Sequence, residues 1–355
     1  MTLRAPYWRT DDGRATLYCG DAAEVLAGIP DNSISLIATD PPYFRVKAET
    51  WDRQWETGAE YIAWIGELCK QWQRILKPNG SLYCFAGPKM GAQIEIEIGR
   101  WLNVLNRITW RKQDGTVNEG GSWSRANKDI LRRFFEQKEE IIFAEHPASS
   151  AEWQNRSDGL RADVFESIRA YLASERQRAG VSKEDINEAL GFRRLGGMAG
   201  RHYFSRSQWC LPTEEHYRKM RECFNAHNRG SEYLRRDYED LRRDYEDLRR
   251  PFTVTPDVPY TDVWDFPTVA AYHGKHPCEK PLAMMRHIIS ASSRPGDTVL
   301  DCFAGSGVTG EAAFQLGRSF IGVEKDDHWC RVARKRIATA QRDTGERAAV
   351  QGMML

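Results

Sequence analysis

Residues 297–324, DTVLDCFAGSGVTGEAAFQLGRSFIGVE, show the alternation of strand and helix that decides the fold class. The run DTVLD predicts a strand, a glycine-rich turn follows it, residues 308–317 predict a helix, and SFIGV predicts the next strand. A strand that returns through a helix to a second strand is the unit of a mainly parallel sheet. Helices cover both faces of such a sheet, so we expect a doubly wound α/β architecture.

The first 145 residues repeat this alternation. In residues 60–76, EYIAWIGELCKQWQRIL, the apolar side chains fall on one helical face, and Lys77-Pro78-Asn79-Gly80 ends that helix. Strands are expected at 15–19, 33–39, 81–86, 103–110 and 140–144, with a short helix at 22–26. The α/β pattern therefore occurs in two halves, which are separated by a region of different composition.

That intervening region is helical in character. Residues 161–228 carry helix-capping signals, and residues 234–250 repeat LRRDYED twice before a third LRR. Tyr238, Leu241, Tyr245 and Leu248 have 3-4-3 spacing, which puts them on one stripe of a helix. Because two and a half heptads are short for a coiled coil, we favour an amphipathic helix packed on its own protein. A homodimer contact stays open.

Four segments follow from these patterns. We expect a first α/β half at 1–147, a mostly α-helical insertion at 148–255, a second α/β half at 256–345 and a tail at 346–355.

The composition places the chain among globular proteins and leaves a nucleic-acid partner open. The net charge is only +1, but a local basic face is enough to bind DNA. The eight cysteines are scattered without a C-x-x-C pair, which indicates reduced thiols and no metal site. Residues 1–15 lack an apolar core, and no stretch reaches the roughly 18 apolar residues that a membrane span needs. We therefore expect a cytoplasmic protein without a membrane partner.

Asp40-Pro41-Pro42-Tyr43 follows the predicted strand 33–39, at the sheet edge where open α/β sheets bind ligands. An exocyclic amine of a base is a poor nucleophile, because its lone pair is delocalised into the ring. Two acceptors, the Asp40 carboxylate and the Pro41 carbonyl, could hold its N–H bonds out of the ring plane. Prolines stiffen the turn, and an aromatic side chain can stack on an extruded base. An ordinary turn at the end of a strand is the alternative interpretation.

The second candidate site is Asp301-Cys302-Phe303-Ala304-Gly305-Ser306-Gly307, which links a strand to a helix. Glycines allow close approach of the backbone to a ligand, and a helix N-terminus favours an anionic group. Glu324 ends the next strand and could accept hydrogen bonds from ribose hydroxyls. Residues 305–310 also match G-x-G-x-x-G, so a dinucleotide oxidoreductase is an alternative. The Asp-Pro-Pro-Tyr strand end argues against it, because hydride transfer does not use that motif.

Together, and in this order, the two motifs resemble the beta group of DNA adenine-N6 and cytosine-N4 methyltransferases. The resemblance covers about residues 1–145 and 256–340. It implies a Rossmann-like methyltransferase fold with S-adenosyl-L-methionine as cofactor and an inserted target-recognition domain. It also implies a catalytic role for Asp40, Pro41, Pro42 and Tyr43.

Further segments match this family. His276-Pro277-Cys278-Glu279-Lys280-Pro281 is similar to the segment that helps to hold the methionine end of the cofactor, and Gly20-Asp21 resembles the strand end near its adenine. The resemblance thus implies a cofactor site of Asp21, Lys280, Asp301, Phe303, Gly305, Gly307 and Glu324. Pro277-Cys278 resembles the nucleophilic dipeptide of cytosine-C5 methyltransferases. It does not end a catalytic strand, so we consider it incidental.

Residues 163–213 provide a candidate DNA-reading region. Ser182-Lys183-Glu184-Asp185 is a capping-box variant that opens helix 183–190, and with helix 163–178 it suggests a helix-turn-helix. Residues 191–213 carry Arg193, Arg194, Arg201 and Arg206, and no acidic residue, interleaved with His202, Tyr203, Phe204 and Trp209. Such a patch suits phosphates and base edges, although a solvated loop with core aromatics is the alternative. Residues 208–213 (QWCLPT) resemble a stretch found in insertions of this family.

The expected activity is methyl transfer to adenine N6 in double-stranded DNA, by base flipping and direct in-line attack. Family members with Asp at the first motif position are mostly adenine enzymes, so cytosine-N4 is the second choice. A DNA-binding regulator with an inactive methyltransferase fold is a further alternative, as is methylation of RNA or a protein glutamine. A restriction-modification role is open, and the sequence does not identify an endonuclease partner.

Overall fold

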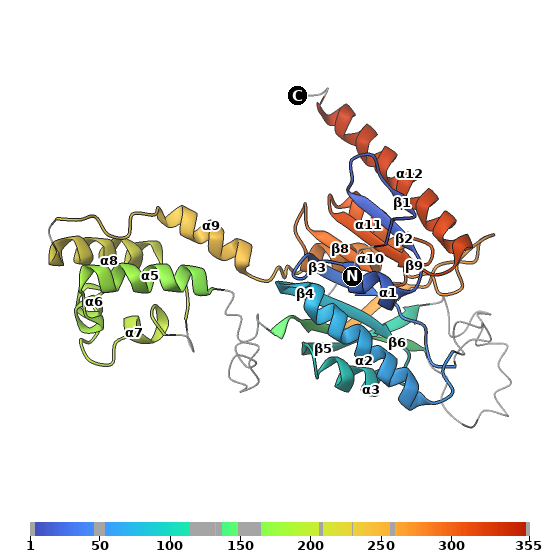
Figure 1. Cartoon of the computed structure of the whole chain (residues 1–355), viewed down its shortest axis with the longest axis horizontal. Helices are drawn as coiled ribbons and strands as arrows, with labels where there is room; N and C mark the ends of the chain where they lie inside the picture. Colours follow the sequence, from blue (N-terminus) through green and yellow to red (C-terminus); the bar gives the residue numbers. More distant parts are fainter. Residues whose placement is uncertain are drawn as a thin grey trace. The chain divides into compact units, whose positions relative to one another are not determined.

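The two α/β halves combine into one sheet in the computed structural model (Figure 1). The structure describes residues 4–45, 54–113, 132, 137–147, 165–205, 209–228, 230–255 and 260–352. Its internal contacts divide the chain into two compact units. Unit 1 comprises Met1–His146 and Pro251–Leu355, and unit 2 comprises Pro147–Arg250.

Unit 1 is built on a mixed sheet. Within the described residues, nine strands lie in the order β1-β2-β9-β8-β3-β4-β6-β5-β7. Their bounds are β1 Trp8–Arg9, β2 Ala15–Cys19, β3 Ile34–Thr39, β4 Leu76–Ala86, β5 Asn103–Gln113, β6 Lys138–Glu145, β7 Val263–Pro267, β8 Thr298–Asp301 and β9 Ser319–Glu324. Neighbours from β2 to β4 are parallel, whereas β6 is antiparallel to both β4 and β5. The expected doubly wound, mainly parallel α/β fold is confirmed.

Helices cover both faces of this sheet. They are α1 Ala22–Gly28, α2 Gly58–Ile75, α3 Gly91–Ile98, α10 Leu282–Ser292, α11 Val308–Gln315 and α12 Asp327–Gly352. Because successive strand residues point to opposite faces, Leu36 packs in a core with α10, α11 and α12, while Ile37 packs in a core with α1, α2 and α3. No helix in the described part of the chain is long and apolar enough to span a membrane.

The strands β3 and β8 create the crevice of the sheet. They are parallel neighbours, with Leu36 opposite Val299 and Ile37 opposite Leu300. From β3 the chain passes through α2 to β4 on one side, and from β8 it passes through α11 to β9 on the other side. Connections that leave in opposite directions open a crevice at the carboxyl ends of the strands. Asp40 and the glycine-rich loop both follow strands that end at this crevice.

Some elements differ from the sequence-based expectation. The strand β4 begins at Leu76, before the expected 81–86, because Leu76 pairs with Ile34 before the register shifts to Leu36 opposite Ser81. The strands β1 and β7 were not expected. The helix α12 continues to Gly352, through most of the segment that we expected as a tail.

Unit 2 is helical in its described residues. Its helices are α5 Glu166–Ala179, α6 Lys183–Ala189, α7 Met198–His202, α8 Glu214–His227 and α9 Tyr238–Leu248. They share a core that includes Leu172, Ile186 and Phe224. The hydroxyl of Ser182 caps α6 by accepting from the N–H of Asp185 at 3.1 Å, which confirms the predicted capping signal.

The heptad stripe belongs to the core of unit 2. Leu241 is fully buried, and Tyr238, Tyr245 and Leu248 pack partly buried against the same core. The hydroxyl of Tyr238 also donates to the carbonyl of Pro212 at 3.0 Å. These contacts favour an amphipathic helix packed on its own unit over a dimer contact.

Shortening Leu241 to Ala should lower the free energy of unfolding by about 2–5 kcal/mol, because it removes buried contacts and leaves a cavity. The exposed Glu239→Ala on the same helix is the control and should stay within about 0.5 kcal/mol. Urea unfolding followed by circular dichroism measures both. An unfolding midpoint that rises with protein concentration would instead favour a dimer contact.

Candidate active site

The carboxyl ends of β3 and β8 are tied together by Thr39, the last residue of β3. Its hydroxyl donates to Oδ1 of Asp301 at 3.1 Å and accepts from the N–H of Cys302 at 3.1 Å. Thr39 is only 1% exposed, so both hydrogen bonds are shielded from water. This side chain therefore fixes the next residue, Asp40, relative to the loop after β8.

Asp301 holds the same loop from the other side. Its Oδ1 also accepts from the N–H of Phe303 at 3.0 Å, and its Oδ2 accepts from the hydroxyl of Thr309 at 2.6 Å. Burial raises the pKa of Asp301 to about 6, although these hydrogen bonds favour the charged form. Both carboxylate oxygens thus support the loop. A direct contact of Asp301 with a cofactor stays a prediction.

The glycine-rich loop has no side chains at Gly305 and Gly307, so its backbone is open to close approach there. Gly305 and Gly307 have φ angles of 50° and 79°, a region that favours glycine. A Cβ at Gly305 would lie 3.3 Å from the ring of His276, and one at Gly307 would lie 2.8 Å from the backbone of α12. Glu324, at the end of β9, accepts from the N–H of Gly305 through Oε2 at 2.8 Å. Burial raises the pKa of Glu324.

Two other predicted cofactor residues lie at neighbouring strand ends. Asp21 follows β2 and caps α1, where its Oδ1 accepts from the N–H of Ala23 at 2.9 Å. The ring of Phe303 lies 5.7 Å from that of Trp64, in the loop after β8. Because β2, β9 and β8 are adjacent and parallel, the structure brings Asp21, Phe303 and Glu324 to one edge of the sheet.

Asp40 is paired with Lys280, which precedes α10. Nζ of Lys280 lies 2.6 Å from Oδ2 of Asp40, and Lys280 is 6% exposed. The other oxygen of Asp40, Oδ1, is buried without a hydrogen-bond partner among the described residues. An unsatisfied buried acceptor costs free energy. Oδ1 is therefore suited to receive a donor from a bound ligand.

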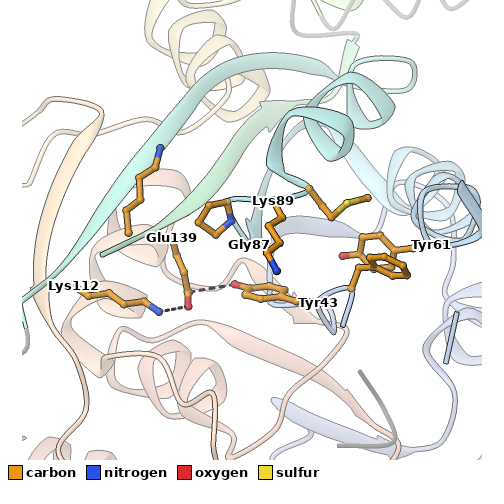
Figure 2. Close-up of a pocket in the computed structure, with 10 residues that line it drawn as sticks. Tyr43, Tyr61, Gly87, Lys89, Lys112 and Glu139 are labelled. Carbon is orange, nitrogen blue, oxygen red and sulfur yellow. Dashed lines mark hydrogen bonds and ion pairs between the residues drawn. The ribbon is translucent and has the colours of Figure 1, made fainter. Parts of the chain in front are cut away.

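Lys280 is shared with Glu139 of β6. Nζ of Lys280 lies 3.1 Å from Oε2 of Glu139, and Oε1 of Glu139 lies 2.5 Å from Nζ of Lys112 of β5. The hydroxyl of Tyr43 donates to Oε2 of Glu139 at 3.2 Å, and Figure 2 shows both contacts of Glu139 with Tyr43 and Lys112. We call these five side chains, Asp40, Tyr43, Lys112, Glu139 and Lys280, the Asp40 cluster.

Burial and neighbouring charges shift the pKa values of Asp40, Glu139 and Lys280 in the Asp40 cluster. Burial raises the pKa of Asp40, and the charge of Lys280 offsets only part of this effect. Burial also acts to raise the pKa of Glu139, but the charges of Lys280 and Lys112 outweigh it and hold the pKa at about 2. Burial acts to lower the pKa of Lys280, yet the two carboxylates raise it. The two acids, Asp40 and Glu139, are thus paired with two amines, Lys112 and Lys280.

A cavity of about 100 Å³ opens beside Tyr43 (Figure 2). Its walls combine rings with lysines, and they comprise Tyr43, Phe44, Tyr61, Gly87, Pro88, Lys89, Met90, Lys112, Lys138 and Glu139. A Cβ at Gly87 would lie 3.2 Å from the ring of Tyr43, so a glycine there makes room for that ring. Such walls suit a planar ring with polar edges.

The predicted basic patch in unit 2 is only partly described. Arg193 and Arg194 are exposed in the turn after α6. Arg194 pairs with Asp185 at 3.2 Å and with Glu188 at 3.3 Å. The side chain of Arg201, in α7, and all of Arg206 lie outside the described residues.

The aromatic residues between these arginines correct one expectation. Tyr203 is 5% exposed and Phe204 is 9% exposed, and Trp209 packs against the same core of unit 2. Their rings fill space between the helices, so the alternative interpretation as core aromatics holds for Tyr203 and Phe204, and they do not belong to an exposed DNA-binding patch.

Three residues of the site were not predicted from the sequence: Thr39, Lys112 and Glu139. Thr39 ends the expected strand 33–39, and Lys112 lies two residues beyond the expected strand 103–110; neither belongs to one of the two motifs. Glu139 stands in the charged run Lys138-Glu139-Glu140, a pattern typical of solvated surface. The position of that run, just before the predicted strand 140–144, was the one available signal.

Fold and site together define an α/β protein that joins an acidic strand end to a glycine-rich ligand loop. The model of the DNA methylase family N6_N4_Mtase matches residues 34–335. The chain therefore belongs to this family of DNA methylases, and the resemblance found in the sequence is confirmed. The family uses S-adenosyl-L-methionine, as predicted.

Individual relatives agree with this assignment. The chain is 25% identical over 348 residues to the DNA adenine methyltransferase YhdJ of Escherichia coli K12, covering 94% of this chain and 86% of the relative. It is 25% identical over 331 residues to the type II methyltransferase M.BglII of Bacillus subtilis, covering 89% and 67%. Among solved structures, the PvuII DNA methyltransferase (cytosine-N4-specific) has the same fold, with a TM-score of 0.54 at 15% identity over 97% and 96% of the two chains.

Replacing Thr39 with Val should lower the free energy of unfolding by about 1–3 kcal/mol, because a side chain of similar shape leaves the buried N–H of Cys302 without its acceptor. Thermal unfolding measures the change. The control is Thr339→Val on the exposed face of α12. Equal stability of the two variants would show that the Thr39 hydroxyl does not tie the two strand ends together.

Proposed function

We propose that this protein transfers a methyl group from S-adenosyl-L-methionine to the N6 amine of adenine in DNA. The observation that carries the proposal is Oδ1 of Asp40, a buried acceptor that has no hydrogen-bond partner among the described residues. It lies at the crevice edge of β3, next to the strand that leads into the glycine-rich loop.

Asp40 and Pro41 would act on the target amine. Oδ1 of Asp40 and the carbonyl of Pro41 accept from its two N–H bonds, which localises the nitrogen lone pair for attack. Pro42 stiffens the turn. Tyr43 stacks on the flipped base, and the cavity beside its ring suits a planar heterocycle. Much of the rate gain comes from holding two reactants in line.

The glycine-rich loop and its neighbours fit the methyl donor. Gly305 and Gly307 leave backbone exposed for close approach. The carboxylate of Glu324 can accept from ribose hydroxyls, and Asp21 lies at the strand end that the resemblance places near the adenine of the cofactor. When bound, S-adenosyl-L-methionine supplies an electrophilic sulfonium methyl. Phe303 adds an apolar wall, while Asp301 supports the loop through Thr39 and Thr309. Lys280, which the resemblance assigns to the methionine end of the cofactor, also pairs with Asp40 on the side of the target base.

Adenine is favoured over cytosine by two observations. The first residue of the motif is Asp40, and family members with Asp there are mostly adenine enzymes. The Escherichia coli relative, which aligns with 94% of the chain, is named an adenine methyltransferase. Cytosine-N4 is the second candidate, because the same pair of acceptors could hold that amine.

An inactive methyltransferase fold used only to bind DNA is less well supported. Such a regulator has no need of an intact reaction site. Here Asp40, Gly305, Gly307 and Glu324 are all present, and the buried charges of the Asp40 cluster are retained at an energetic cost.

We assign DNA reading to the insertion 148–255, with α5, α6 and α7 as a helix-turn-helix. The capped α6 and the exposed Arg193 and Arg194 support this assignment. Arginines in this turn would contact phosphates or base edges of double-stranded DNA.

Changing Asp40 to Ala should abolish methyl transfer, because the target amine loses its principal acceptor, while binding of S-adenosyl-L-methionine stays within a few-fold. Transfer of labelled methyl to DNA and calorimetric titration of the cofactor measure the two effects. Asp31→Ala, ahead of the other end of β3, is the control. Transfer at the wild-type rate by the Asp40 variant would refute this role.

Arg193→Ala should weaken DNA binding more than Arg194→Ala, because Arg194 is already paired with Asp185 and Glu188. Loss of one phosphate contact should also reduce the salt dependence of DNA binding by about one unit of slope. Fluorescence anisotropy at several salt concentrations measures both variants. Unchanged DNA binding by both would contradict a role for this turn.

A further inference from the structure

Lys280 stands between two carboxylates. Its ammonium group lies 2.6 Å from Oδ2 of Asp40 and 3.1 Å from Oε2 of Glu139. Glu139 is held in turn by Lys112 at 2.5 Å and accepts from the hydroxyl of Tyr43 at 3.2 Å. Of the two catalytic candidates of the turn after β3, Tyr43 therefore contacts Glu139 of β6 directly, and Asp40 is connected to Glu139 through Lys280.

We propose that Glu139 is a positioning residue for methyl transfer: it shares Lys280 with Asp40 and holds the hydroxyl of Tyr43, so that Asp40 presents one oxygen to the target amine. This inference rests on the proposed function, since it concerns the same reaction.

The charges of the three groups explain why Lys280 interacts with both Asp40 and Glu139. An ammonium group paired only with Asp40 would withdraw electron density from its carboxylate and compete with the target amine for its lone pairs. A second carboxylate, on Glu139, takes part of this interaction. Lys112 then balances the added negative charge, which a buried site requires.

Glu139 also sets the direction of Tyr43. The ring of Tyr43 borders the cavity, and only its hydroxyl reaches the carboxylate (Figure 2). Gly87 leaves the space that the ring occupies. Because the phenol keeps its proton at neutral pH, it can act as a donor to Glu139: burial and the neighbouring carboxylates raise the pKa of Tyr43 well above its usual value.

The reaction itself needs this balance. A bond forms between the amine nitrogen and the methyl carbon while the bond from sulfur to that carbon breaks, so the positive charge moves from sulfur to nitrogen. The nitrogen then releases a proton, for which Asp40 is the nearest base. Asp40 must be ionised beforehand, and its interaction with Lys280 must be weak enough to leave it an effective acceptor.

The groups that face Asp40 and Glu139 come from several elements. Their charges and burial together decide the proton affinity of Asp40. They are Tyr43 after β3, Cys84 of β4, Lys112 of β5, Cys278 and Lys280 before α10, and Asp301 of β8.

Glu139→Gln should lower kcat for DNA methylation by about 100-fold, the size of effect expected when a reacting group is misplaced. The KM for S-adenosyl-L-methionine should stay within about threefold, because Glu139 does not touch the glycine-rich loop. Gln lacks the charge that raises the pKa of Asp40, and its neutral amide oxygen holds Lys280 more weakly than the Glu139 carboxylate does, so Lys280 interacts more strongly with Asp40. Both effects lower the pKa of Asp40, so the acid limb of the profile of kcat/KM against pH should move to lower pH.

Glu140→Gln is the matched control. Glu140 is the next residue of β6, is 6% exposed and pairs with Lys138 at 2.8 Å, yet it contacts neither Asp40 nor Lys280 in the structure. This variant should keep the wild-type pH profile. Glu139→Asp, which keeps the charge, should recover activity relative to Glu139→Gln and restore the acid limb.

Thermal unfolding and the fluorescence of 2-aminopurine at the target position check that the variants fold and flip the base. A folded Glu139→Gln with the wild-type kcat and pH profile would overturn the inference. So would a loss of activity with an unmoved acid limb, which a merely structural role would give. If the wild-type protein does not methylate DNA, the proposed function itself is refuted. This result differs from the two outcomes above, in which the wild-type protein is active and only the role of Glu139 is refuted.

Discussion

The hydroxyl of Thr39 forms hydrogen bonds that connect the two halves of the reaction site. The relative positions of the other site residues depend on these bonds. The hydroxyl links β3, which carries the acidic turn, to β8, which carries the glycine-rich loop, through two buried hydrogen bonds. These strands lie far apart in the sequence, and only the order of the sheet makes them neighbours. Since the target base and the methyl donor must meet in line, the fold has to fix these two strand ends relative to each other.

Two kinds of polar side chain lie in the crevice at the carboxyl ends of β3 and β8. Asp301 and Glu324 use their oxygens to hold backbone in place, which shapes the loop without ligand. The Asp40 cluster instead keeps buried charges in balance, and Oδ1 of Asp40 accepts no hydrogen bond from the part of the chain that the structure describes. Buried ion pairs contribute little to stability, since desolvation offsets their attraction. Their retention here is better explained by chemistry than by stability.

The sequence predicted the elements with strong periodicity, and it missed those that depend on tertiary pairing. Alternation of apolar strands and amphipathic helices was enough to place β3, α2, β8 and α11. In contrast, β7 is a short run that contains Asp265 and Pro267, and it forms a strand only because β5 offers an open edge.

The site residues also divide into those that the sequence predicted and those that it missed. Asp40 and Gly305 lie in motifs whose residue types indicate a chemical role, so both were predicted from the sequence. Glu139 lies in a charged run, and it contacts Lys280 and Tyr43, which are both distant in the sequence, so the local pattern did not point to it. The rings of Tyr203 and Phe204 illustrate the opposite error, because aromatic residues beside arginines resemble a binding patch until the core that they fill is known.

Mass spectrometry of the nucleosides can show whether this crevice methylates the amine of adenine. DNA of mixed sequence is incubated with the purified protein and S-adenosyl-L-methionine, then digested and analysed. We expect N6-methyladenine. N4-methylcytosine would keep the amine chemistry and correct the base, whereas C5-methylcytosine alone, or no methylated nucleoside at all, would refute amine methylation by this crevice.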